Sequence, residues 1–210
     1  MDNKWTQIPT DDVINKTVEA LKANNIEAFV VENGEEAKKK FFELVPEKSE
    51  VFTNTSTTLD QLGITEEINE SGKFVSLKNK VSEMPANTPE EQIKKRQIGT
   101  AMQYSVGSVH AITQDGHTVI ASGSGSQLPG YAYGAEHVVW VASANKIVRD
   151  IQEGIQRIYE HALPLEDVRM KKVYGPESGS NPRKILIFNS DPVWTPDRTK
   201  LILVKEQFGF

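Results

Sequence analysis

The segment that decides the fold is PTDDVINKTVEALKANNIEAFVV, residues 9–31. In its first half, Ile14, Val18 and Leu21 follow one another at steps of four and three residues, the spacing of one face of a helix. Two asparagines end this pattern, and Ile26 to Val31 is then an apolar run of strand length. A helix that leads directly into an apolar strand is a repeating unit of α/β folds.

The same alternation of helical and strand patterns continues along the chain. An amphipathic helix is expected after Asn33-Gly34, and the β-prone run 50–53 precedes a polar loop and a helical segment at 59–64. Thr88-Pro89-Glu90-Glu91 is a helix-entry signal, which predicts a helix that continues to about Tyr104. Further helices are expected at 150–161 and 165–170, and further strands at 73–77, 137–142, 184–189 and 200–204. This order predicts an α/β fold with a largely parallel open sheet and flanking helices.

One antiparallel β-hairpin is expected in the middle of the chain. Two β-prone runs flank Asp115-Gly116, and Asp-Gly is a residue pair that two-residue type I′ turns prefer. A turn of that kind places His110 opposite Ala121, at the end of the hairpin that leads into a Ser/Gly-rich segment.

Length and composition limit the class of protein. A chain of 210 residues is long enough for a complete core, and we expect a single domain over residues 1–210. The 24 Lys+Arg and 29 Asp+Glu residues are interspersed and give a net charge of −5, which argues against a nucleic-acid partner. The apolar runs are strand-sized and the first residues lack a secretory signal pattern, so neither a membrane span nor export is expected. With no cysteine in the chain, we expect a cytoplasmic protein without disulfides or thiolate metal sites.

The segment Ala121–Pro129, ASGSGSQLP, is the strongest candidate for ligand binding. Glycines allow successive backbone N–H groups to converge, and serines add hydroxyl donors, so such a loop can hold a phosphate or carboxylate. The candidate binding residues are Ser122, Gly123, Ser124, Gly125, Ser126 and Gln127. A flexible turn between a strand and a helix is the alternative, and the spacing matches neither a P-loop nor Gly-x-Gly-x-x-Gly.

A second polar loop, with Thr55, Ser56 and Thr57, also lies between a strand and a helix. Ligands of open α/β sheets bind beyond the carboxyl ends of the strands, so we expect both loops at one crevice. Capping of the following helix explains the same residue types equally well. Lys146 is a candidate cation for an acidic ligand, although an exposed loop lysine is the more common case.

His110 and Asp115 are the candidate catalytic residues, because imidazole and carboxylate groups are the usual acids and bases of enzymes. A hydrogen-bonded structural histidine is the alternative for His110. In an extended strand pair His117 lies about 13 Å from His110, too far to share a metal ion, so no metal site is expected. No cofactor motif is present.

Several stretches resemble the LUD-domain family of lactate-utilisation proteins. They are 107–116, GSVHAITQDG; 121–129, ASGSGSQLP; 135–141, AEHVVWV; 145–148, NKIV; and the C-terminal residues 199–210. The resemblance implies the fold of ribose-5-phosphate isomerase, CoA transferases and methenyltetrahydrofolate synthetase. In that fold, loops after the sheet strands build the ligand crevice, which would unite Thr55–Thr57, Gly107–His110 and Ser122–Gln127.

The function that we expect is binding of a small anionic metabolite, a hydroxy acid or a phosphorylated compound, in organic-acid utilisation. The lactate analogy implies an oxidoreductase as partner protein, and a homo-oligomer is left open. Two alternatives stand beside it: an isomerase or transferase acting on a phosphorylated or CoA-linked substrate, and a ligand sensor without catalysis. A CoA transferase needs a glutamate nucleophile, and neither loop 53–58 nor loop 121–129 contains one.

Overall fold

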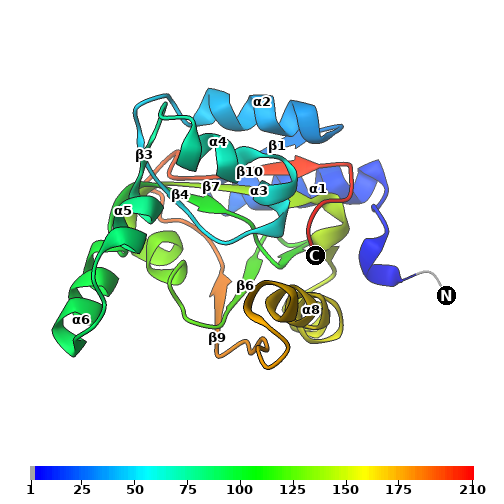
Figure 1. Cartoon of the computed structure of the whole chain (residues 1–210). Helices are drawn as coiled ribbons and strands as arrows, with labels where there is room; N and C mark the ends of the chain where they lie inside the picture. Colours follow the sequence, from blue (N-terminus) through cyan, green and yellow to red (C-terminus); the bar gives the residue numbers. More distant parts are fainter. Residues whose placement is uncertain (1–2) are drawn as a thin grey trace.

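Six parallel strands form the main sheet, in the order β1-β10-β7-β4-β2-β3 (Figure 1). The structure is a computed structural model, and it describes residues 3–210. The strands are β1 (Ile26–Val31), β2 (Glu50–Thr53), β3 (Val75–Ser76), β4 (Met102–Gly107), β7 (Ala135–Ser143) and β10 (Thr199–Val204). Along β7, Val138 and Trp140 enter one core while Val139 and Val141 enter the other. The sheet is therefore buried on both faces, as parallel sheets generally are.

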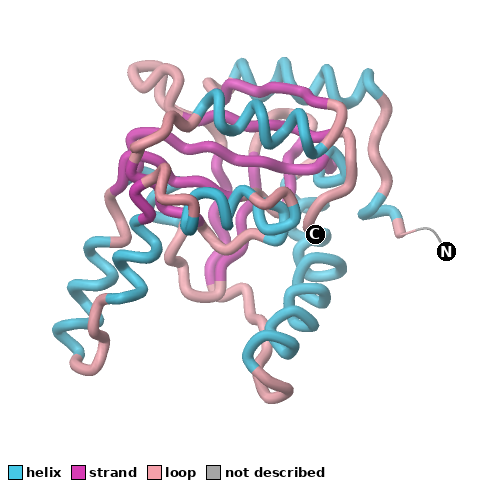
Figure 2. Tube along the Cα trace, turned by 45° about the horizontal axis from the view of Figure 1, so that its top comes forward, coloured by secondary structure: helices cyan, strands magenta, loops and turns pink. Residues whose placement is uncertain are grey.

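Helices cover the two faces unequally (Figure 2). On one face, Phe41, Leu59 and Ile68 pack on the sheet from three helices, α2 (Gly34–Leu44), α3 (Thr57–Gln61) and α4 (Ile64–Glu70). On the other face, α1 (Asp11–Ala23) contributes Ile14 and Leu21. The helix–strand alternation expected from residues 9–31 is thus confirmed, because α1 leads directly into β1.

A second, four-stranded sheet packs beside α1 on that other face. Its order is β8 (Ile147–Val148), β5 (Ala111–Thr113), β6 (Thr118–Ser122) and β9 (Lys184–Phe188). Ile112, Ile120 and Phe188 join the core that contains Trp140. The expected hairpin is confirmed as the antiparallel pair β5–β6, but it belongs to this second sheet and not to the main one.

The turn of the hairpin differs from the expected two-residue type. Ala111 pairs with Val119, so the loop has three residues, and Gly116 at its end has a positive φ of 85°. Backbone hydrogen bonds from Thr113 N–H to the His117 carbonyl and from Gly116 N–H to the Thr113 carbonyl close this loop. The Thr113 hydroxyl adds to them, since it accepts the His117 N–H at 2.9 Å and donates to the Asp115 carboxylate. His110 is consequently not opposite Ala121, and the expected register is wrong by one residue.

Helices are present where three others were expected, but their ends differ from the expected ones. The helix expected to reach Tyr104 is α6 (Pro89–Ile98), and Tyr104 lies in β4 at the centre of the sheet. The two helices expected at 150–161 and 165–170 form one continuous run: α7 (Ile151–Arg157), the π-helical turn η4 (Ile158–Ala162) and α8 (Leu163–Tyr174).

The remaining elements are short or project from the body. They are η1 (Lys4–Thr6), α5 (Leu77–Glu83), the π-helical turn η2 (Gly130–Gly134) and the 3-10 turn η3 (Ala144–Lys146). Leu77 begins α5, which shortens the strand expected at 73–77. Within residues 3–210, none of the helices has both the length and the apolar character needed to cross a bilayer.

Candidate functional site

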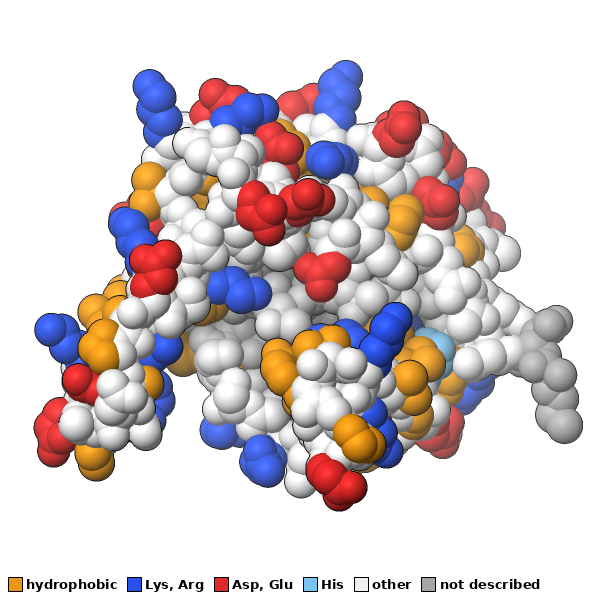
Figure 3. Space-filling model, viewed as in Figure 1, with side chains coloured by type: hydrophobic (Ala, Val, Ile, Leu, Met, Phe, Trp, Pro, Cys, Tyr) orange, Lys and Arg blue, Asp and Glu red, His pale blue; other side chains and the backbone are white. Residues whose placement is uncertain are grey.

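A cleft of about 550 Å³ lies where several strands end. The neighbouring strands β2, β4 and β7 run parallel, so the loops that follow them emerge at one edge of the sheet. These loops bring Thr55, Ser108 and Lys146 to the cleft, and the loop after β6 adds the Ser/Gly segment. Helix α8 and the residues after it form the outer wall, and the surface is hollowed beside α8 (Figure 3).

Lys146 lies at the inner end of this cleft, only 2% exposed. The η3 turn after β7 directs its side chain inward, where Nζ donates to Thr58 Oγ1 at 3.3 Å, Ser108 Oγ at 3.1 Å and the Val109 carbonyl at 3.2 Å. All three partners are neutral, and within residues 3–210 Lys146 forms no ion pair. Burial, with a smaller contribution from the charge of Arg157, lowers the pKa of Lys146 well below its usual value.

Arg157 is a second buried cation next to Lys146, with 0% exposure. Its Nη1 donates to the His110 carbonyl at 2.7 Å, whereas Nε and Nη2 have no hydrogen-bond partner among the described residues. Burial lowers the pKa of Arg157 to about 10, so the guanidinium remains charged at neutral pH. Arg157 does not line the cleft itself, and it acts there through its charge.

Two histidines, His110 and His161, lie near these cations. Both are neutral at pH 7. Burial and the charges of Lys146 and Arg157 lower the pKa of His110 to about 3. Burial and the same two cations lower the pKa of His161 to about 4. The Nδ1 atom of His110 accepts the Ala121 N–H at 3.2 Å, so the ring proton is on Nε2. His110 lines the cleft, as expected, although its hydrogen bond also gives it a structural role.

The polar loop after β2 lines the cleft with Thr55, Ser56 and Thr57, together with Thr58. The Ser56 hydroxyl also accepts the Leu59 N–H at 3.3 Å and thereby caps α3. Helix capping and a place in the cleft, which were alternatives in the sequence, therefore both hold for this loop.

The Ser/Gly loop lies in the same cleft as the Thr55–Thr57 loop, through Ser122, Gly123, Ser124, Ser126 and Gln127. Gly125 is not among the lining residues. Hydrogen bonds within the loop occupy two of its amides: Gly125 N–H donates to Ser122 Oγ at 2.8 Å, and Ser126 N–H donates to Ser124 Oγ at 3.2 Å. The convergence of the two loops is as expected, but these two amides are not free to bind an anion.

Asp115 lies away from the cleft, in the turn of the β5–β6 hairpin. It borders a shallower depression together with Lys16 and Asn24 of the α1 end. The structure therefore separates the two candidate catalytic residues, His110 and Asp115. The β5–β6 hairpin itself separates them, because Asp115 lies in its turn and His110 at its other end.

Sequence reasoning missed Arg157 and His161. The helix there is indicated by Ile151, Ile155 and Ile158, of which Ile158 is buried and Ile155 packs on the same core. The buried face also contains Gly154, Arg157 and His161, and Gly154 lets α7 approach Val119 and Ala111 closely. The spacing Gly-x-x-Arg-x-x-x-His was the available signal, since it places an arginine and a histidine on the same face as a glycine.

Comparison with known proteins supports the fold and the family. The LUD domain family model matches residues 14–204. The chain belongs to the LUD-domain family. A solved DUF162 family protein from Deinococcus radiodurans resembles this LUD-domain protein with a TM-score of 0.50 and 10% identity, over 93% of this chain and 99% of that chain. At this identity the likeness shows the fold alone, and no curated protein matches the chain in sequence.

The charges at the rim of the LUD-domain cleft differ from those inside it. Glu166 and Arg169 of α8 both line the cleft, and they neutralise each other through two contacts of 2.6 Å and 2.7 Å. Inside, Lys146 and Arg157 have no acid of this kind among the described residues. The interior therefore has a positive potential in a poorly solvated space, where electrostatic interactions are stronger than in water.

Proposed function

We propose that this LUD-domain protein binds a small anionic metabolite, with its carboxylate or phosphate group at the inner end of the cleft near Lys146. One observation supports this most strongly: two cations, Lys146 and Arg157, are buried at the cleft without a carboxylate partner in residues 3–210. A ligand anion is the partner that such a pair lacks.

Burial of an unpaired cation lowers the stability of the folded protein. Burial without an opposite charge costs several kcal/mol per ion even after relaxation. Here Arg157 stays charged and burial lowers the pKa of Lys146, and a bound anion would offset the cost of charge at both positions. By contrast, the buried Arg198 of the same chain is paired with Asp191 at 3.0 Å. The fold can therefore provide a carboxylate for a buried arginine, as it does for Arg198, but among the described residues it provides none for Arg157 beside the cleft.

The size and lining of the cleft favour a small polar ligand. Its volume of about 550 Å³ lies within the range of metabolite sites. Hydroxyl groups of Thr55, Thr57 and Ser124 line it and can bind the hydroxyl or oxo groups of a hydroxy acid or sugar phosphate. Because the family is that of LUD-domain proteins, we propose a role in organic-acid utilisation, with 2-hydroxy acids as the first ligands to test and an oxidoreductase as the partner.

A thermal-shift screen tests the proposal directly. The panel contains L-lactate, glycolate, ribose 5-phosphate and inorganic phosphate, because a ligand that binds only the native state raises the melting temperature. We expect at least one of these anions to raise it for the wild-type protein and for Lys172→Met, in which an exposed α8 lysine is changed. The shift should be lost in Lys146→Met, which removes the same charge inside the cleft.

Two results would contradict anion binding in the cleft. The first is a panel in which no anion changes the melting temperature. The second is a shift of equal size in Lys146→Met and Lys172→Met, because the anion would then bind to general surface charge.

A further inference from the structure

The amine of Lys146 is held in a fixed position inside the cleft. Its stem is buried, and Nζ contacts the hydroxyl oxygens of Thr58 and Ser108 at 3.3 Å and 3.1 Å. Each hydroxyl can accept a hydrogen bond from an ammonium group or donate one to a neutral amine, because a hydroxyl hydrogen rotates to suit its partner. This environment therefore accommodates both protonation states of the lysine.

The two buried cations are suited to different tasks. Arg157 stays charged at neutral pH and has two nitrogen atoms without partners among the described residues, so it is a permanent source of positive potential. The burial of Lys146 and the nearby charge of Arg157 both lower the pKa of the Lys146 amine. Desolvation beside another cation is a recognised way to activate a lysine nucleophile. The pair thus combines a fixed positive charge with an amine that gives up its proton readily.

We propose that Lys146 is a nucleophile that forms an imine with the carbonyl group of a 2-oxo acid bound in the cleft. This inference rests on the proposed function, because the carboxylate is what holds the ligand there. In a 2-oxo acid the carbonyl carbon is bonded directly to the carboxylate carbon. A carboxylate drawn to the inner end of the cleft therefore brings a carbonyl carbon close to Nζ of Lys146.

The proposed step conserves atoms and electrons without an additional reactant. The Nζ lone pair attacks the carbonyl carbon, the C–O π bond breaks, and one proton passes from Nζ to the former carbonyl oxygen, which gives a carbinolamine. The C–O bond of the carbinolamine then breaks as the nitrogen lone pair forms the C=N bond, and the proton that remained on the nitrogen is transferred to the departing oxygen, which leaves as water. The Ser108 and Thr58 hydroxyls, which contact Nζ, can relay these protons.

His110 is placed to influence the same step. It lines the cleft, is neutral at pH 7, and carries its ring proton on Nε2 because Nδ1 accepts the Ala121 N–H. A neutral imidazole can donate a hydrogen bond to the carbonyl oxygen without adding a third positive charge beside Lys146 and Arg157.

Borohydride trapping tests the imine on the full chain. The wild-type protein is incubated with pyruvate, sodium borohydride is added, and the products are analysed by intact-mass and peptide mass spectrometry. We expect a single adduct whose added mass equals pyruvate minus water plus two hydrogens, mapped to Lys146. Lys172→Met should give the same adduct, and Lys146→Arg, which keeps a cation but has no primary amine, should lose it. Incubation with L-lactate, which has no carbonyl beside its carboxylate, should give no adduct.

Parallel melting-temperature measurements distinguish failure of the imine from failure of anion binding. A pyruvate-dependent rise in melting temperature without an adduct at Lys146 would overturn the imine and leave anion binding standing. An adduct spread over exposed lysines such as Lys172 would also overturn it. If the anion panel and pyruvate produce neither shift nor adduct, both proposals fail.

Discussion

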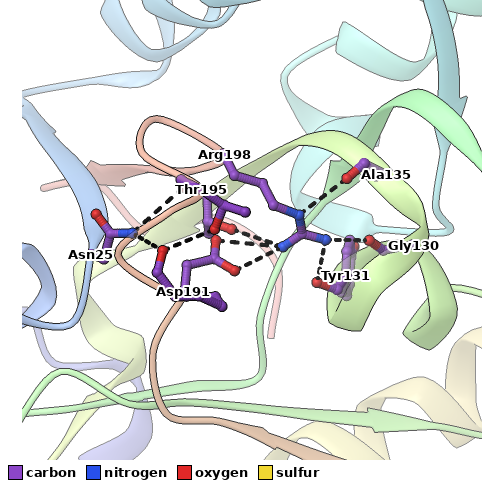
Figure 4. Close-up of polar contacts among 9 residues, drawn as sticks. Asn25, Gly130, Tyr131, Ala135, Asp191, Thr195 and Arg198 are labelled. Atoms are coloured by element: carbon purple, nitrogen blue, oxygen red, sulfur yellow. Dashed lines mark hydrogen bonds and ion pairs between the residues drawn. The ribbon is translucent and has the colours of Figure 1, made fainter.

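Two buried arginines of this protein differ in how far their hydrogen bonds are satisfied. Arg198 contacts the Asp191 carboxylate at 3.0 Å and the carbonyls of Gly130, Tyr131 and Ala135 at 3.0–3.1 Å (Figure 4). Arg157 donates one hydrogen bond, to the His110 carbonyl, and within residues 3–210 it has no acid partner. Both arginines are shielded from solvent, so burial alone does not explain the difference.

This difference distinguishes a buried charge that stabilises the fold from a buried charge that can interact with a ligand. Arg198 precedes β10 and connects the start of β7 to the η2 turn, so its charge stabilises the edge of the sheet opposite the cleft loops. Arg157 is next to the cleft, where burial is the main cause of the lowered pKa values of His110 and Lys146 and the unpaired charge of Arg157 lowers them further. A buried charge with a complete set of partners is structural, whereas one without them points to a ligand.

The largest expected loss of stability follows removal of Asp191, the partner of Arg198. Asp191→Ala leaves the Arg198 guanidinium buried without its carboxylate, and breaking a buried ion pair in this way costs about 3–5 kcal/mol of unfolding free energy. Urea denaturation measures the loss. Glu177→Ala, which removes an exposed loop carboxylate, is the control and should change the stability little. A loss for Asp191→Ala as small as that of the control would show that the Arg198 pair is not structural.

A smaller loss of stability is expected on acidification, because protonation of His110 and His161 adds positive charge near Lys146 and Arg157, which have no acidic partner among the described residues. The pKa of His110 is about 3 in the folded protein and about 6.5 when unfolded. Between these values the unfolded chain binds a proton that the folded one does not, so stability falls as the pH decreases. His161, with a pKa of about 4, acts in the same direction. Allowing for solvent in the cleft, we expect His110 to contribute about 1–2 kcal/mol of loss between about pH 7 and pH 5.

The variant His110→Asn isolates this contribution. The asparagine Oδ1 takes the position of Nδ1 and can still accept the Ala121 N–H, but the side chain does not titrate. Denaturation curves at the two pH values should therefore show a smaller loss for His110→Asn than for the wild type. Equal losses in both proteins would mean that His110 does not resist protonation.

Arg157→Met should have a smaller effect on stability than Asp191→Ala. The change removes one hydrogen bond, to the His110 carbonyl, at a cost of about 1 kcal/mol, but it also removes an unpaired buried charge. The two contributions oppose each other, so we expect the unfolding free energy to change by less than about 1 kcal/mol. The anion-dependent rise in melting temperature should decrease because the positive potential at the cleft is weaker. A destabilisation as large as that of Asp191→Ala would make Arg157 a structural residue.

Local sequence patterns predicted the fold class and the loops of the cleft, but they did not predict every strand or the hairpin register. Helix–strand alternation and two polar loops after strands are local patterns, and they were sufficient to predict the fold class and the meeting of Thr55–Thr57 with the Ser/Gly loop. The Met102–Gly107 strand was missed because the preceding helix pattern has no sharp end and the strand contains both polar and apolar buried residues. The hairpin register was wrong because Asp115-Gly116 also suits a three-residue loop, in which the glycine takes a positive φ at the end of the turn.

The burial of Lys146 and Arg157 was not predicted from the sequence, because burial of a charged side chain depends on its tertiary neighbours. Lys146 is followed by two apolar residues in the sequence, yet its environment is made by Thr58 in the first turn of α3 and by Ser108 in the loop after β4. Arg157 is buried because α7 lies against the β5–β6 hairpin, with Gly154 at the contact. In both cases the decisive neighbours are distant in the sequence.

The smallest expected effect is that of Asp115→Asn, which tests whether the proposed chemistry belongs to the cleft alone. Asp115 is at the exposed hairpin turn, where its carboxylate accepts a hydrogen bond from the Thr113 hydroxyl and lies 3.5 Å from Nε2 of His117. Asparagine can still accept the hydrogen bond from Thr113, and an exposed pair of this kind contributes little, so stability should change by less than about 0.5 kcal/mol. The anion-dependent melting shift and the pyruvate adduct at Lys146 should both be unchanged, because Asp115 does not line the cleft. If Asp115→Asn abolished either one, the unpaired charge of Arg157 and Lys146 would no longer be sufficient to explain where the ligand binds.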